Sequence, residues 1–247
     1  MRPDGQSIAY LKTPGSATGP GVLWLSGFKS DMAGTKAAAL DAWARERGRA
    51  YTRFDYFGHG RSSGTFAEGT VSRWLDDALA VLDQITEGPQ VLVGSSMGGW
   101  IATLVALRRP ARIAGLVLIA PATDFTEELI WKNLPEAARR DIMDRGGWLR
   151  PSAYDPEPYP ITRALIEDGR RHLILGAQVG VRAPVRVLQG MADPDVPYTH
   201  ALKLVSHLPA DDVTLSLIPG GDHRLSRPQD LAMMIQAVES IIAQAEA

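Results

Sequence analysis

Six short apolar runs alternate with segments of helical periodicity along this 247-residue chain, and this alternation restricts the fold more than any other feature. The runs are rich in Leu, Val and Ile, which is typical of strands buried on both faces of a parallel sheet. They occupy residues 21–27, 49–56, 89–94, 114–120, 185–190 and 213–219. Strands that alternate with helices predict a doubly wound α/β sheet, with ligands bound beyond the carboxyl ends of the strands.

Five other segments have the spacing of helices, and the start of the chain is typical of an edge strand. The predicted helices span about 35–47, 71–86, 97–109, 198–207 and 228–245, and the antiparallel edge strand is expected at 4–10. A chain of this length with 45% hydrophobic residues can bury one large core. We therefore expect a single domain over residues 1–247.

The segment from residue 124 to about 178 interrupts the alternation, because it contains helical pieces but no convincing strand. A connection this long needs structure of its own, so we predict a helical cap inserted into the domain. Its aromatic residues are Trp131, Trp148, Tyr154 and Tyr159, close to the proline-rich "YDPEPYP". We expect at least half of them to form the cap's own core and the others to contact an apolar substrate.

Composition excludes several classes of function. The 26 Lys and Arg against 28 Asp and Glu give a formal charge of −2, without a long run of one sign that would bind nucleic acid or an anionic membrane. The chain has no cysteine, which excludes disulfides, thiolate metal sites and a cysteine nucleophile. Its five histidines are scattered without a His-x-x-x-His spacing, so we expect neither a metal nor another cofactor.

The N-terminal stretch "MRPDGQSIAYLKTPG" has no apolar core of signal-peptide length and no Arg-rich amphipathic pattern. No later run reaches the roughly 18 apolar residues of a membrane span. These features predict a cytoplasmic protein.

The stretch "VLVGSSMGGW" at residues 91–100 predicts a nucleophile at a sharp strand-to-helix turn. Residues two before and two after such a nucleophile crowd each other, so both must be small. Ser96 satisfies this condition with Gly94 and Gly98, whereas Ser95 would place Val93 and Met97 at the crowded positions. Ser96 is therefore the predicted nucleophile.

A serine nucleophile needs a histidine base, and the chain order serine, acid, histidine is typical of this architecture. His59 precedes Ser96 and is excluded, His172 lies in the predicted cap, and His200 and His207 share one predicted helix. His223 follows the last predicted strand in the glycine-rich "IPGGDHRL", so it is the predicted base.

The acid that orients the histidine is expected after the preceding strand, where "VRVLQGMADPDVP" supplies two carboxylates. Asp193 is preferred because it lies three residues beyond Gly190, close to the strand end. Asp195 is an alternative that could instead cap the next helix, and Asp124 is a more distant one.

Acyl transfer also needs two backbone N–H donors for the oxyanion. The residue after the nucleophile supplies the first, which is Met97. The second is expected from "LSGFKSD", where Gly27 allows close approach and Phe28 would offer its N–H.

The chain resembles the α/β-hydrolase superfamily through "GSSMGG", "GMADPDVP", "GGDH" and "RFDYFGHGRSSG", over nearly its whole length. Together with "GFKSDMAGTKA", these motifs are similar to those of the subfamily that includes the mitochondrial palmitoyl-protein thioesterase, also called mycophenolic acid acyl-glucuronide esterase, and bacterial relatives. The resemblance implies the same Ser96, Asp193 and His223 assignment. Arg53, Asp55, Gly58 and Gly60 are expected to hold a turn beside the site.

These observations predict a serine hydrolase that cleaves ester or thioester bonds through an acyl-enzyme, with an apolar acyl group and a small-molecule or acylated-protein substrate. Three alternatives use the same residues or fold: a cofactor-free perhydrolase or haloperoxidase, a peptidase, and a non-catalytic binding protein.

Overall fold

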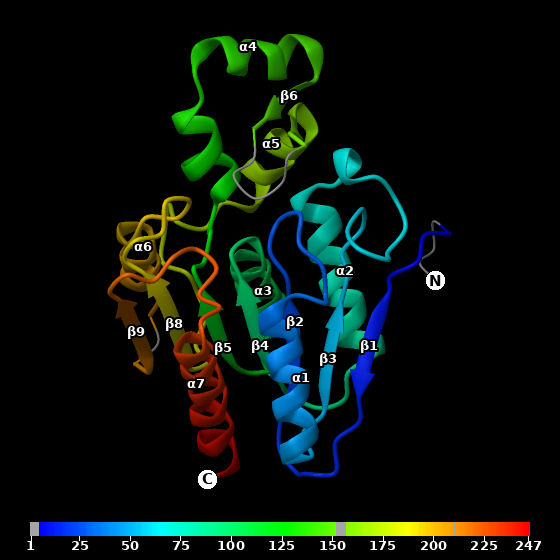
Figure 1. The fold of residues 1–247 in the computed structure, drawn as a ribbon, viewed down its shortest axis with the longest axis vertical. Coiled ribbons are helices and arrows are strands. Elements are labelled where there is room, and N and C mark those ends of the chain that lie inside the picture. The colour runs from blue at the N-terminus through cyan, green and yellow to red at the C-terminus, as the bar shows by residue number, and fades with distance from the viewer. Residues whose placement is uncertain (1–4, 152–156, 210) are drawn as a thin grey trace.

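The computed structural model describes residues 5–151, 157–209 and 211–247. Its main sheet has seven strands in the order β1-β3-β2-β4-β5-β8-β9, and every neighbouring pair is parallel except β1 with β3 (Figure 1). The strands are β1 Tyr10–Thr13, β2 Gly21–Leu25, β3 Tyr51–Phe54, β4 Gln90–Ser95, β5 Ile113–Ile119, β8 Val185–Gly190 and β9 Val213–Ile218. The doubly wound parallel sheet predicted from the sequence is confirmed.

All six predicted core strands form, and the edge strand is displaced from its expected place. It begins at Tyr10, the last residue of the predicted 4–10 segment, and pairs antiparallel with β3. Central strands β2 and β4 are buried along their whole length, because helices cover both faces of the sheet.

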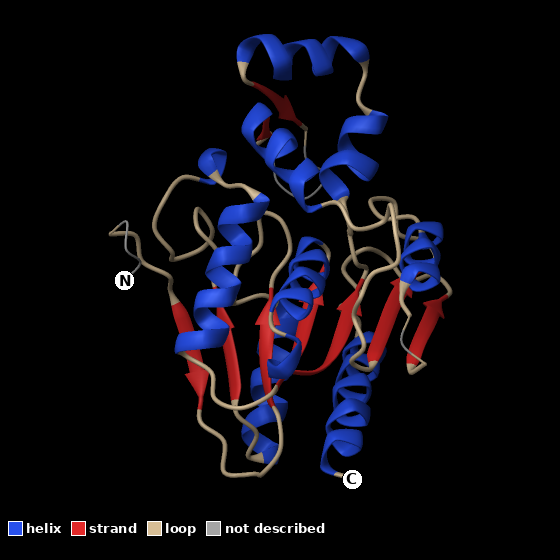
Figure 2. Ribbon diagram, turned by 180° about the vertical axis from the view of Figure 1, so that it is seen from behind, coloured by secondary structure: helices blue, strands red, loops and turns tan. Residues whose placement is uncertain are grey.

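Helices pack on both faces of the sheet, as the views from front and back show (Figures 1 and 2). One apolar cluster joins α1 and α7 to one face, and another joins α2, α3 and α6 to the opposite face. These helices are α1 Thr35–Arg47, α2 Val71–Gln84, α3 Met97–Arg108, α6 Tyr198–His207 and α7 Pro228–Glu246. Each lies within two residues of its predicted bounds.

The segment between β5 and β8 lies above the carboxyl ends of the strands, where Figure 1 shows α4, β6 and α5. Its elements are a π-helical turn Thr126–Ile130, a 3₁₀ turn Trp131–Asn133, α4 Glu136–Arg145, β6 Gly147–Arg150, β7 Tyr159–Thr162, α5 Arg163–Gly169 and a 3₁₀ turn Arg170–His172. Further 3₁₀ turns span Phe66–Glu68 and Pro110–Arg112. Because the segment between β5 and β8 lies over the carboxyl ends of the strands, it is placed to cover a site there.

The prediction that this segment contains no strand is wrong. Strands β6 and β7 pair antiparallel with each other, from Gly147 opposite Thr162 to Arg150 opposite Tyr159. Each has only four residues, and Pro160 lies within β7. So short a pair has neither the length nor the continuous apolar character by which the core strands were recognised.

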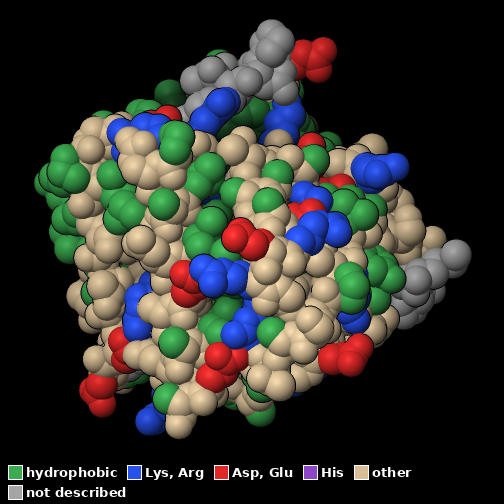
Figure 3. Space-filling model, turned by 60° about the horizontal axis from the view of Figure 1, so that its bottom comes forward, with side chains coloured by type: hydrophobic (Ala, Val, Ile, Leu, Met, Phe, Trp, Pro, Cys, Tyr) green, Lys and Arg blue, Asp and Glu red, His purple; other side chains and the backbone are tan. Residues whose placement is uncertain are grey.

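Among the described residues, no helix has both the length and the hydropathy needed to cross a bilayer. On the face turned away from α4, Lys and Arg side chains lie beside Asp and Glu (Figure 3). Positive and negative charges are therefore interspersed over the part of that face that the figure draws.

Candidate active site

Ser96 lies at a sharp turn between β4 and α3, in a backbone conformation that few residues other than glycine adopt. Its φ is 55° and its ψ is −120°, and α3 begins at the next residue, Met97. Such a backbone costs of the order of 1–3 kcal/mol and persists only where the surrounding structure enforces it. Here the enforcement is close packing, since a Cβ atom at Gly94 would lie 2.6 Å from the carbonyl carbon of Gly98.

Replacing Gly94 with alanine is expected to lower the free energy of unfolding by about 1–3 kcal/mol, because the new Cβ meets backbone atoms of Gly98 and Gly99 that cannot move aside easily. Chemical denaturation measures this loss. Gly176→Ala is the matched control, since no atom lies within 4 Å of a Cβ at that position. Equal stability of the two variants would contradict a crowded turn.

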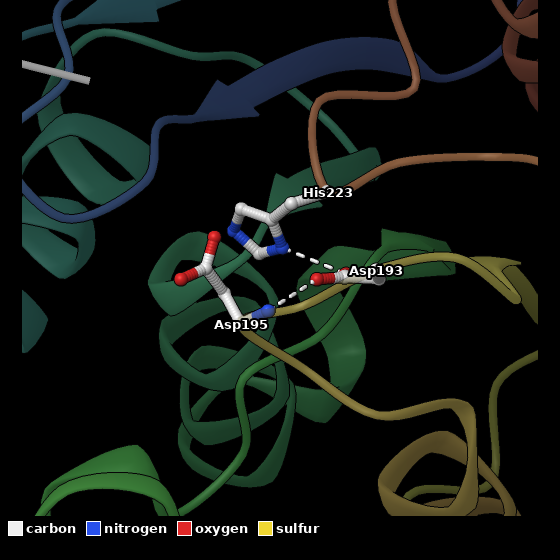
Figure 4. A group of neighbouring side chains, drawn as sticks. All are labelled: Asp193, Asp195 and His223. Carbon is white, nitrogen blue, oxygen red and sulfur yellow. Dashed lines mark hydrogen bonds and ion pairs between the residues drawn. The ribbon is translucent and has the colours of Figure 1, made fainter. Parts of the chain in front are cut away.

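A continuous hydrogen-bonded chain joins the predicted nucleophile, base and acid. His223 Nε2 lies 3.1 Å from Ser96 Oγ, and His223 Nδ1 lies 2.8 Å from Asp193 Oδ2. Figure 4 shows the imidazole facing the Asp193 carboxylate. An ionised carboxylate can only accept, so Nδ1 carries a hydrogen and neutral His223 presents Nε2 to the serine as an acceptor.

The Asp193 carboxylate is buried and held from several sides. Its Oδ1 accepts the backbone N–H groups of Asp195 and Val196, each at 2.9 Å, and Gln189 Nε2 donates to Oδ2 at 3.2 Å. Burial alone would raise the pKa of Asp193, but the hydrogen bonds from His223, Val196 and Asp195 outweigh it and hold the pKa below its ordinary value. Asp193 therefore stays ionised beside the imidazole at neutral pH.

The two alternative acids have other positions. Asp195 does not cap α6, because the N-cap residue is Pro197, which makes no side-chain hydrogen bond there. Asp195 instead lines the cavity, and one of its carboxylate oxygens lies within 4.8 Å of an imidazole nitrogen of His223. Asp124 accepts the backbone N–H groups of Ile174 and Leu175 instead. Of the three candidates, Asp193 is the one whose carboxylate is hydrogen-bonded to His223 Nδ1, at 2.8 Å.

The other histidines bond elsewhere. His172 Nε2 lies 2.7 Å from Ser72 Oγ, His200 Nε2 contacts the Thr123 carbonyl at 2.7 Å, and His207 Nδ1 contacts the Lys203 carbonyl at 2.7 Å. His59 is buried and contacts Lys29 and Phe57.

The turn that carries Phe28 lies directly against Ser96. A Cβ atom at Gly27 would lie 3.4 Å from Ser96 Cβ, and Ser30 N donates to the Gly27 carbonyl at 3.1 Å across the turn. Met97 is the first residue of α3, where a helix leaves backbone N–H groups without an intrahelical acceptor. The two residues predicted to stabilise an oxyanion thus belong to segments that meet at Ser96.

A cavity of about 400 Å³ opens beside Ser96 and His223. Its apolar lining comes from Phe28, Ala122, Phe125, Leu129, Ile130 and Val196. Of the four aromatic residues predicted in the cap, Tyr159 lines this cavity. Trp131 and Trp148 pack against the apolar core, and Tyr154 lies outside the described residues.

Charged side chains also line the cavity, and apart from Asp195 sequence reasoning did not identify them. They are Lys29, Lys36, Arg150, Arg224 and Asp195. Burial lowers the pKa of Lys36 to about 8, although Asp222 acts in the opposite direction. These residues come from separate segments, and nothing in the local sequence indicates that they meet.

Comparison with known proteins agrees with the fold. The family model described as "Serine aminopeptidase, S33" matches residues 22–157. A Bos taurus protein named palmitoyl-protein thioesterase ABHD10, mitochondrial, is 36% identical over 98% of this chain and 78% of its own length. The chain belongs to the α/β-hydrolase family. The predictions of an α/β-hydrolase fold and of a hydrolytic enzyme are therefore confirmed.

Two solved structures resemble this α/β-hydrolase closely. A putative hydrolase from Agrobacterium vitis S4 has a TM-score of 0.94 and 49% identity, covering 98% of this chain and 95% of that one. The mouse α/β-hydrolase domain-containing protein 10 has a TM-score of 0.90 and 35% identity, covering 99% and 97%. Because the bovine relative is named as mitochondrial, it does not support the predicted cytoplasmic location, which stays a prediction.

Proposed function

We propose that this α/β-hydrolase cleaves carboxylic ester or thioester bonds through an acyl-enzyme intermediate, with Ser96 as nucleophile, His223 as base and Asp193 as its orienting acid. The observation that carries the proposal is the hydrogen-bonded chain from Ser96 Oγ through His223 to Asp193, at the edge of the cavity. A serine becomes an effective nucleophile when an adjacent base can take its proton.

In the first half of the reaction, Ser96 Oγ attacks the substrate carbonyl carbon while His223 Nε2 takes the hydroxyl proton. The carbonyl oxygen becomes an oxyanion, which the backbone N–H groups of Phe28 and Met97 would stabilise. When the intermediate collapses, the imidazolium returns its proton to the departing oxygen or sulfur. The acyl group remains bonded to Ser96.

In the second half, water takes the place of the leaving group. His223 removes a proton from the water as it attacks the acyl carbon, and Ser96 Oγ leaves with that proton as the acid is released. Asp193 keeps His223 in the required tautomer and stabilises the imidazolium that forms in both halves. The low pKa of Asp193 suits this role, because the carboxylate stays charged throughout the reaction.

An apolar acyl group is the substrate feature that the cavity lining supports. Phe125, Leu129 and Ile130 form part of an apolar wall beside Ser96. Thiolate and activated alkoxide leaving groups depart with little assistance, whereas an amine needs efficient protonation. The name of the bovine relative, a palmitoyl-protein thioesterase, agrees with a long acyl chain on sulfur.

We expect kcat/KM for 4-nitrophenyl esters to rise from acetate towards octanoate, by up to about fourfold for each methylene that becomes buried. The same series of acyl thioesters should rise in parallel, and a peptide amide series should be cleaved poorly. A flat response beyond acetate would remove the apolar acyl group from the proposal. Efficient amide cleavage would favour the peptidase alternative, to which the family description "Serine aminopeptidase" also points.

A cavity-filling variant locates the acyl group. Leu129→Trp should lower kcat/KM for the octanoate ester by about tenfold or more, because the larger side chain fills space that a long acyl chain needs. The kcat/KM for the acetate ester should be little changed. The matched control is Leu202→Trp, at an α6 residue that is 43% exposed and does not belong to the described cavity lining. Equal losses for both esters would place the acyl chain elsewhere.

A further inference from the structure

His59 is a buried histidine whose two ring nitrogens both have backbone partners. Lys29 N donates to Nε2 at 3.1 Å, and Nδ1 lies 3.0 Å from the Phe57 carbonyl oxygen. A backbone N–H can only donate, so Nε2 is an acceptor. The hydrogen must then be on Nδ1, which donates it to Phe57. The hydrogen-bond network thus assigns a neutral imidazole in a single tautomer.

We propose that His59 is a positioning residue for the oxyanion loop, defined as residues 27–30, which it holds against Ser96 by accepting the Lys29 N–H. The inference rests on the proposed function, because Phe28 in this loop is the proposed oxyanion donor. His59 does not touch the reacting atoms. It acts through the backbone of Lys29, the residue that follows Phe28.

The oxyanion loop needs such support because Lys29 has a backbone conformation that a lysine does not favour. Lys29 has a φ of 56°, a left-handed conformation that is unfavourable for a residue with a Cβ atom. A change in that conformation would rotate the peptide between Phe28 and Lys29, whose N–H is bonded to His59. The hydrogen bond therefore fixes the peptide that adjoins the proposed donor.

A second contact from the same segment holds the chain just beyond the loop. Asp55 Oδ1 accepts the Met32 N–H at 2.7 Å, and Arg53 Nη1 donates to the Met32 carbonyl at 3.0 Å. Asp55 Oδ2 also accepts the Arg61 N–H at 2.8 Å, which ties His59 into the same compact turn. The loop at Lys29 and the chain just beyond it at Met32 are thus held to one rigid support.

Aromatic packing joins His59 to Phe28 itself. The His59 ring packs edge-on against Phe66 and Trp74, with centroid distances of 5.2 and 5.5 Å. The Phe28 ring contacts the same two rings at 4.8 and 5.7 Å. The imidazole and the Phe28 side chain therefore pack on the same two aromatic rings, so displacement of either one would disturb the packing of the other.

The neutral state of the imidazole is consistent with its surroundings. Burial lowers the pKa of His59, outweighing the Phe57 carbonyl and the Asp55 carboxylate, which act in the opposite direction. A protonated ring would place an N–H against the Lys29 N–H and break the contact. The acceptor at Nε2 is consequently present at neutral pH.

Two substitutions separate the acceptor from the bulk of the side chain. His59→Gln can place an amide oxygen where Nε2 lies, whereas His59→Leu has no acceptor. Because oxyanion-hole donors act on the transition state, we expect His59→Leu to lower kcat for 4-nitrophenyl butyrate by about 10²-fold, with KM changed by less than about threefold. His59→Gln should retain kcat within about tenfold of wild type.

A glycine at position 29 supplies an independent test, which applies even where His59→Leu folds poorly. Glycine adopts a positive φ without strain, so Lys29→Gly in the His59→Gln or His59→Leu background should raise kcat towards wild type.

The control for the loss of a buried histidine is His200→Leu, which removes a contact with the Thr123 carbonyl. It should lower the melting temperature while kcat stays within about threefold.

The outcomes divide clearly. His59→Leu with a lower melting temperature but unchanged kcat would reduce His59 to a core residue and overturn the inference, as would equal kcat for His59→Gln and His59→Leu. A rise in KM alone would move His59 to substrate binding and also overturn it. Ser96→Ala is measured beside them: if it keeps full turnover, the proposed function fails, and if it is inactive, a negative His59 result concerns only the loop.

Discussion

Ser96→Ala is expected to lower kcat by about 10⁶-fold, leaving only the turnover that substrate binding and the oxyanion donors support. The reason is geometric, because Ser96 Oγ is the hydroxyl that lies 3.1 Å from His223 Nε2. Its backbone, with a φ of 55°, projects the side chain from the turn between β4 and α3 into the cavity lining. Without the Ser96 hydroxyl, the proposed reaction cannot form an acyl-enzyme.

The adjacent serine is the matched control. Ser95 is the last residue of β4, is only 7% exposed, and also lines the cavity. Ser95→Ala removes one hydroxyl from that lining, so kcat should stay within about tenfold of wild type. A fluorophosphonate probe should label wild type and Ser95→Ala but not Ser96→Ala. Labelling that persists in Ser96→Ala and disappears in Ser95→Ala would exchange their roles.

The turn around Ser96 was predictable because its causes are local. The crowding between Gly94 and Gly98 is a property of four successive peptide units, so residue sizes alone distinguish Ser96 from Ser95. The core strands were predictable for a similar reason, since their apolar character follows from burial on both faces. Chain order then placed His223 and Asp193 at the same edge of the sheet.

Features that depend on distant partners were not predictable. The β6–β7 pair is too short and too little buried to differ from a loop in its sequence pattern. The sequence suggested a supporting turn at Asp55, but the bond between His59 and Lys29 joins residues 30 positions apart, and no local pattern connects them. Lys36 and Arg150 meet at the cavity only through the fold.

Asp193→Asn is expected to lower kcat by about 10⁴-fold, through the tautomer of His223 rather than through lost packing. The backbone N–H groups of Asp195 and Val196 both donate to Oδ1, so the amide oxygen of an asparagine would take that position. Its NH₂ group would then face His223 Nδ1 in place of Oδ2. Two donors cannot face each other, so Nδ1 would have to accept and the hydrogen would move to Nε2.

An imidazole with its hydrogen on Nε2 has no acceptor for the proton of Ser96, which is why the loss should appear in kcat with little change in KM. Asp195→Asn is the matched control, because Asp195 supplies its backbone N–H to Asp193 and keeps that bond after the substitution. Its side chain lines the cavity beside the imidazole, so kcat should fall by less than about tenfold. The two variants are compared at saturating substrate, with melting temperatures to verify folding. Equal losses would divide the orienting charge between the two carboxylates, and a larger loss for Asp195→Asn would transfer the acid's role to Asp195.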